Sequence, residues 1–146
     1  MKTEDPFQLS RFINAQELIY STALKELQNG RKQTHWMWFI FPQLSALGHS
    51  STALFYGITG IDEAVAYLQQ PLLRDRLEEC TKAVLKCRES NAKEIFGFPD
   101  VLKFQSCLTL FAKAEPENKL FKEALDKFYQ GLTDQETEKF LINHKI

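Results

Sequence analysis

A short stretch after residue 34 collects side chains that could do chemistry. His35 comes directly before a run of six apolar residues at 36–41, and Gln43 and Ser50 follow soon after it. An imidazole, an amide and a hydroxyl beside an apolar wall are typical of a small-molecule pocket. We therefore expect His35 to serve a catalytic or ligand role and Gln43 and Ser50 to bind polar groups of a ligand.

The apolar run at 36–41 has two interpretations. Aromatic clusters are more often plain core than stacking surfaces, because each ring contributes a large buried area. If part of the run faces a ligand, Trp36 and Trp38 are the side chains that we expect to stack on a base. The run is also too short for its period to distinguish a buried strand from a helix.

A second group of polar side chains begins after Pro99. Asp100, Lys103, Ser106 and Thr109 are spaced three apart, which places them along one seam of a helix. A buried lysine needs an acidic partner, a path to solvent or a ligand anion. We therefore expect Lys103 to reach solvent, to form a local ion pair with Asp100 or to contact a ligand phosphate. Ser106 and Thr109 would then bind further polar groups.

These two groups of residues leave the reaction open. Hydrolysis of an N-glycosidic bond would need an acid or a base, for which His35 and Asp100 are the candidates. Both also have structural interpretations, since His35 can serve as a hydrogen-bonding residue in a helical turn and Asp100 can complement a helix dipole. The sequence has no glycine-rich phosphate loop or nucleophile motif, and its three histidines lack zinc-site spacing. We predict neither a metal nor a cofactor.

The elements that must position these residues are predicted to be helices. Apolar residues recur at helical spacing over 6–28, 72–88 and 120–128, and the segment 101–111 is apolar on almost every side. No segment alternates with period two for long, and no hairpin turn separates two β-branched runs. The predicted fold is all-α, a single domain over 1–146 in which about seven or eight helices surround a central apolar helix.

Composition restricts the remaining function classes. The chain has 146 residues, of which 44% are hydrophobic and 25% charged, with a formal net charge of -1. A charge near zero without a basic block offers no long-range attraction for nucleic acid. No apolar run approaches the roughly 20 residues of a membrane span, and the first residues lack the apolar core of a secretion signal. We expect a cytoplasmic protein that binds neither nucleic acid nor membrane, with its three cysteines reduced.

The sequence resembles a known family over nearly its whole length. The motifs that carry the resemblance are His35-Trp36-Met37-Trp38-Phe39-Ile40-Phe41-Pro42-Gln43, Phe96-Gly97, Pro99-Asp100, Lys103 and Ser106-Cys107-Leu108-Thr109. They are similar to those of domain-of-unknown-function family 1810, some members of which are labelled calpastatin. The resemblance implies an all-helical domain from bacteria and related sources, without an established activity. The calpastatin label does not fit, because inhibitory calpastatin segments are disordered and this chain is rich in core residues.

A fainter similarity leads to the functional hypotheses. In helical character and in the aromatic residues beside His35 and Gln43, the chain is similar to the NADAR group, which is linked to ADP-ribose and N-glycoside chemistry. This similarity is an analogy between folds. We expect a domain that binds a nucleotide or ADP-ribose-like ligand, with N-glycoside hydrolysis as a reaction it would support. The alternative is a non-enzymatic protein-interaction module that exposes its aromatic stretch, and a third interpretation makes every unusual polar residue structural.

Overall fold

The computed structural model describes residues 5–88 and 91–144, and within these ranges all regular elements are helices. The all-α prediction is therefore confirmed. The prediction that the first residues form no secretion signal rests partly on residues 1–4, and these lie outside the described ranges. The described residues form ten α-helices and one 3-10 helix: α1 (Ser10–Glu17), α2 (Tyr20–Gln28), α3 (Met37–Ile40), η1 (Ser45–Leu47), α4 (Ser51–Tyr56), α5 (Ile61–Gln69), α6 (Pro71–Lys86), α7 (Ala92–Phe96), α8 (Asp100–Ala114), α9 (Lys119–Tyr129) and α10 (Gln135–Asn143).

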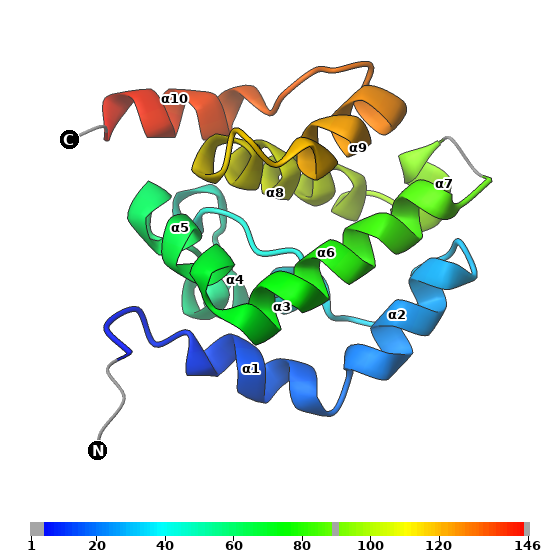
Figure 1. Ribbon diagram of the computed structural model, residues 1–146, viewed down its shortest axis with the longest axis horizontal. Helices are drawn as coiled ribbons and strands as arrows, with labels where there is room; N and C mark the ends of the chain where they lie inside the picture. Colours follow the sequence, from blue (N-terminus) through cyan, green and yellow to red (C-terminus); the bar gives the residue numbers. More distant parts are fainter. Residues whose placement is uncertain (1–4, 89–90, 145–146) are drawn as a thin grey trace.

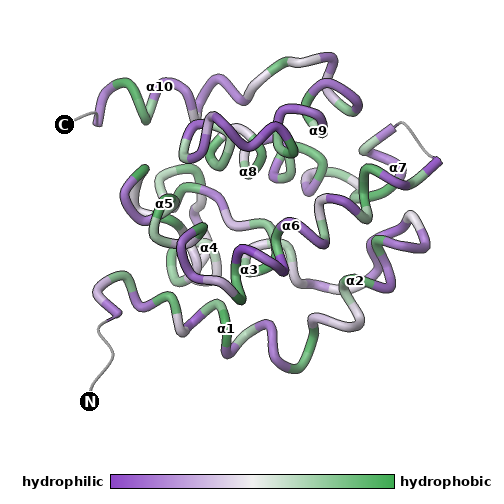
Figure 2. The backbone as a smooth tube through the Cα atoms, viewed as in Figure 1, coloured by the Kyte–Doolittle hydropathy of each residue, from purple (hydrophilic) through white to green (hydrophobic). Residues whose placement is uncertain are grey.

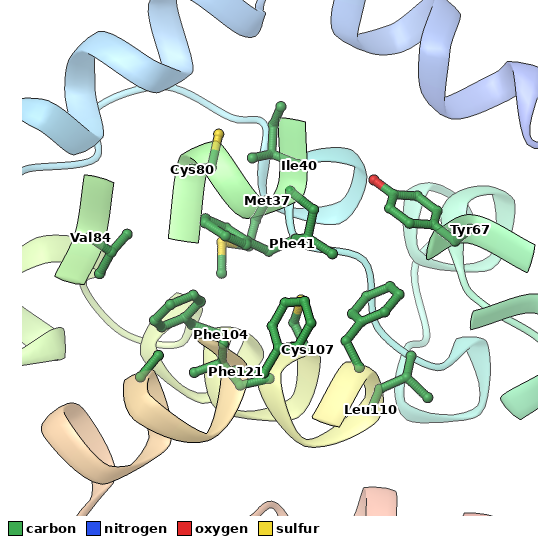
Figure 3. Packing of buried hydrophobic residues seen from close by; sticks show 14 of the residues in the cluster. Met37, Ile40, Phe41, Tyr67, Cys80, Val84, Phe104, Cys107, Leu110 and Phe121 are labelled. Carbon is green, nitrogen blue, oxygen red and sulfur yellow. The ribbon is translucent and has the colours of Figure 1, made fainter. Parts of the chain in front are cut away.

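The apolar helix predicted at the centre of the fold is α8. It packs against α5, α7, α9 and α10 (Figure 1), and it carries mostly hydrophobic residues, whereas hydrophilic and hydrophobic positions alternate along α6 (Figure 2). Figure 3 shows Phe104 and Cys107 of α8 facing Phe121 of α9 and the buried residues of α3. All three of these side chains are 0% exposed. Within the described ranges, no helix combines the length and the apolar character needed to cross a membrane.

The prediction of one continuous helix over 6–28 is wrong. The Asp5 carboxylate accepts hydrogen bonds from the backbone N–H groups of Leu9 and Ser10, and helix α1 begins only at Ser10. The helix then stops at Glu17, and α2 leaves in a new direction after Leu18, which is 95% exposed (Figure 1). The two halves differ in their main partners, because α1 packs chiefly on α3 and also contacts α6, whereas α2 packs on α6. Tertiary contacts therefore override a helical spacing that fits a single helix.

The apolar run at 36–41 forms a short helix, α3, rather than a strand. Helical spacing turns four of its residues inward and leaves the other two partly exposed. The buried residues are Trp36, Met37, Ile40 and Phe41, and the partly exposed ones are Trp38 and Phe39. The run is thus mostly core, with one indole ring near the surface.

Gly57 lies where the chain leaves α4 and passes against η1. A Cβ added at Gly57 would come within 2.3 Å of both Cα and Cβ of Ser45. Backbone atoms cannot move aside as a flexible side chain can. Gly57→Ala is therefore expected to lower the free energy of unfolding by about 1–3 kcal/mol, which urea titration measures. Gly60→Ala is the control, because nothing lies within 4 Å of its added Cβ. Equal stabilities of the two variants would contradict the expectation.

Candidate functional site

Two lysines share one carboxylate where the loop after α2 meets the start of α8. Lys32 Nζ lies 2.8 Å from Asp100 Oδ2, and Lys103 Nζ lies 3.3 Å from Asp100 Oδ1. The Lys32 side chain is only 8% exposed, that of Asp100 18% and that of Lys103 29%. Two ammonium groups around one carboxylate leave a positive charge uncompensated within the cluster. Because water is partly excluded, an anion brought to this place would be attracted more strongly than at an open surface.

These three side chains line a small depression, which we call the lysine hollow, together with His35, Trp36 and Trp38. Its volume is about 110 Å³. Lys103 Nζ lies 5.5 Å from the centre of the Trp38 ring, within the range of cation–π attraction. Small-molecule pockets usually measure about 300–1,000 Å³. The lysine hollow therefore has room for one chemical group, such as a phosphate, and not for a whole nucleotide.

The loop at 31–36 is held in place by Glu26 of α2. Oε1 of Glu26 accepts from the backbone N–H groups of Gln33 and Thr34 and from the indole N–H of Trp36, while Oε2 accepts from the Thr34 hydroxyl. Glu26 is 8% exposed. Burial by itself raises the pKa of this carboxyl, but the hydrogen bonds outweigh that effect and lower the pKa of Glu26 below its ordinary value. An ionised, buried carboxylate thus fixes the loop beside the hollow.

Four of the side chains predicted for the site lie together at the lysine hollow: His35, Trp38, Asp100 and Lys103. His35 is exposed at its rim, and Trp38 is partly exposed. Trp36 also lines the hollow, but it is 1% exposed and its indole N–H donates to Glu26. Trp36 is therefore part of the core, and Trp38 is the one of the two tryptophans that is partly exposed.

The other four predicted residues do not line the lysine hollow. The Ser50 hydroxyl accepts a backbone N–H and caps α4. Ser106 and Thr109 donate their hydroxyls to carbonyls one turn earlier in α8, and Thr109 also accepts a backbone N–H at the start of α10. Gln43 is 2% exposed, and its amide nitrogen has no hydrogen-bond partner within the described part of the chain. Three of the four thus have structural partners.

Two residues of the site, Lys32 and Glu26, were not predicted from the sequence. Lys32 stands three residues before His35 and reads as an ordinary loop lysine, although its side chain proves to be buried. Glu26 follows Ala23 by three residues on the apolar face of its helix. An acidic residue on an apolar face was the available signal, because a buried carboxylate must have partners.

Two of the three cysteines, Cys80 and Cys107, are not candidates for nucleophilic chemistry. Cys80 and Cys107 are buried and free, and no group of three potential metal ligands occurs among the residues described. Burial raises the pKa of the Cys80 thiol to about 12 and that of Cys107 well above its ordinary value. Since the thiolate is the reactive form, both thiols are inert near neutral pH.

Comparisons with known proteins agree with this fold and give no activity. Among curated proteins, none matches the sequence. The crystal structure of the conserved hypothetical protein Rv1873 from Mycobacterium tuberculosis is similar, with 48% sequence identity and a TM-score of 0.93 over 94% of this chain and 99% of that one. The family described as "Protein of unknown function (DUF1810)" matches residues 6–141. The chain therefore belongs to the DUF1810 family.

Proposed function

We propose that this protein binds a small phosphate-bearing ligand, of the nucleotide or ADP-ribose-like class, at the lysine hollow. The observation that carries the proposal is the buried side chain of Lys32, which is 8% exposed. An ammonium has three donors. Within the described part of the chain, Lys32 Nζ contacts the Asp100 carboxylate, which it shares with Lys103, and lies 5.2 Å from the centre of the Trp36 ring. Phosphate oxygens would satisfy the remaining donors and neutralise the excess charge.

The rim of the hollow supplies the contacts for the rest of such a ligand. Trp38 is partly exposed there, and a tryptophan ring stacks on any nucleobase. His35 is exposed on the same rim and can donate to or accept from a hydroxyl or a phosphate oxygen. The ligand would thus place one phosphate between the lysines and its base over Trp38.

The contacts of Asp100 favour binding over hydrolysis as the primary function. Both of its carboxylate oxygens already contact lysine ammonium groups, so neither is held ready to take a proton from a substrate. N-glycoside hydrolysis therefore depends on His35, whose exposed imidazole is the remaining candidate acid or base. The alternative of a protein-interaction module has less support, because most of the aromatic stretch at 36–41 is buried.

Lys103→Ala is the variant that tests the proposal. AMP at one hundred times its dissociation constant should stabilise the folded wild-type protein by about 2.7 kcal/mol in thermal unfolding. Lys103→Ala is expected to weaken AMP about tenfold, which corresponds to about 1.4 kcal/mol, because the phosphate loses one of two cations. Isothermal titration calorimetry measures the same affinities directly.

The matched control is Lys139→Ala on α10, which removes the same charge from a side chain that is 70% exposed and remote from the hollow's lining. It should leave the affinity for AMP unchanged. A wild-type protein that none of inorganic phosphate, AMP and ADP-ribose stabilises would contradict the proposal. Equal losses of AMP affinity in the two variants would mean that AMP binds through general charge attraction and not at the lysine hollow.

A further inference from the structure

A second hollow shares the lining residue Lys32 with the lysine hollow. Its volume is about 520 Å³, against about 110 Å³ for the lysine hollow, and Lys32 lines both. Its walls are the end of α2 with the following loop, at 29–32, and the segment 93–97 at α7. The backbone N–H of Lys32 donates to the carbonyl of Ile95 at 2.7 Å. This bond joins the two walls of the second hollow to each other.

The second hollow is positively charged and open. Arg31, Lys32 and Lys93 line it, with Glu94 as its single acidic side chain. Among the residues that the structure describes, neither Arg31 nor Lys93 has an ion-pair partner. A Cβ placed at Gly97 would meet nothing within 4 Å, so the space beside this residue is empty of protein atoms.

The two volumes differ in what they can hold. The second hollow lies within the range of about 300–1,000 Å³ that small-molecule pockets occupy, whereas the lysine hollow has room for one group. Lys32 is the residue that the two linings share, its side chain is 8% exposed, and its ammonium group retains donors that Asp100 does not use. A phosphate bound by Lys32 would therefore contact a residue that also lines the second hollow, whose walls carry two further cations.

We infer that the ligand has two parts, joined by a diphosphate that lies at Lys32. One phosphate occupies the lysine hollow with the base over the ring of Trp38, and a second polar group fills the second hollow. Arg31 and Lys93 then bind the second phosphate and the group attached to it, because guanidinium and ammonium donors match phosphate oxygens. The ligand class is a nucleoside diphosphate that carries a second polar group, such as a sugar. This inference rests on the proposed function.

The test compares AMP with ADP-ribose on the full chain by isothermal titration calorimetry at one fixed salt concentration, because salt screens these charges. ADP-ribose is expected to bind the wild-type protein at least about tenfold more tightly than AMP. The double variant Arg31→Ala/Lys93→Ala should lose this advantage, with ADP-ribose weakened about tenfold and AMP changed less than about twofold. The readout is the difference in affinity between AMP and ADP-ribose, because a general loss of fold would weaken the binding of both.

The control for charge is Lys82→Ala/Lys119→Ala, which removes two exposed lysines from α6 and α9 that line neither hollow. It should change neither affinity. If AMP binds but ADP-ribose binds no more tightly, or if Arg31→Ala/Lys93→Ala weakens both probes equally, the two-part ligand is overturned while the proposed function stands. If neither probe binds the wild-type protein, both proposals fall together.

Discussion

Replacing Glu26 by alanine is expected to lower the free energy of unfolding by about 3 kcal/mol, because the variant leaves several donors without an acceptor. The indole N–H of Trp36 is the donor most affected, since Trp36 is 1% exposed and this N–H donates to Glu26. The backbone N–H groups of Gln33 and Thr34 lose the same carboxylate. Urea unfolding followed by circular dichroism measures the loss of stability. Because the loop at 31–36 is released, the variant should also bind AMP more weakly at the lysine hollow.

Glu26→Gln tests the contribution of the charge alone, because glutamine keeps nearly the same shape as glutamate and carries no charge. Its amide oxygen can still accept from the three N–H donors, so the variant should lose clearly less stability than Glu26→Ala. The lowered folded-state pKa of Glu26 adds a pH dependence. Its contribution is complete above the ordinary value of 4.5 and declines as the pH falls through the lower folded-state value. The stability difference between wild type and Glu26→Gln should therefore shrink in acid, and a constant difference would count against this role.

Arg11→Met is expected to lower the free energy of unfolding by about 3–5 kcal/mol, because it leaves a buried carboxylate without its cation. Arg11 Nη2 lies 2.7 Å from Oε2 of Glu63, which is 1% exposed. The same guanidinium donates to the backbone carbonyls of Phe55 and Gly57, so it also ties α1 to the end of α4. The free energy of unfolding from urea titrations measures the effect.

A double variant distinguishes the stranded charge from the lost packing. Arg11→Met/Glu63→Met removes both charges together, and a buried ion pair replaced by apolar residues of similar volume is often neutral in stability. We expect the double variant to be more stable than Arg11→Met, so that the two changes are strongly non-additive. A double variant as unstable as the sum of the single ones would mean that the carbonyl contacts of Arg11 dominate.

The helices could be predicted where local chemistry alone decides them. The segment 101–111 is apolar on almost every side, and a helix of this kind is expected at the centre of a bundle. Ser50 before α4 and Pro71 at the start of α6 mark helix beginnings by their own hydrogen-bonding chemistry. The break at Leu18 could not be predicted, because the partners on which α1 and α2 pack lie far away in the sequence.

The candidate site, like the helices, could be predicted only where local spacing decides the contact. An ion pair between Asp100 and Lys103 follows from their spacing in a helix, and the structure forms it. Lys32 could not be found in this way, since its burial comes from the docking of its loop on α7. Ser106 and Thr109 have the spacing of a polar seam, but a hydroxyl in a helix can bond to the carbonyl of the preceding turn. Spacing does not distinguish that local bond from a contact with a ligand.

The position of Asp100 in the first turn of α8 links the lysine hollow to the folding of the whole domain. Helix α8 continues from this turn into the core, where Phe104 is 0% exposed, and no hinge separates the two. A ligand that binds only the native arrangement of this turn and of the loop at 31–36 stabilises the folded state of the whole domain. Binding at the hollow and folding of the domain are therefore linked equilibria, so that a shift in one shifts the other.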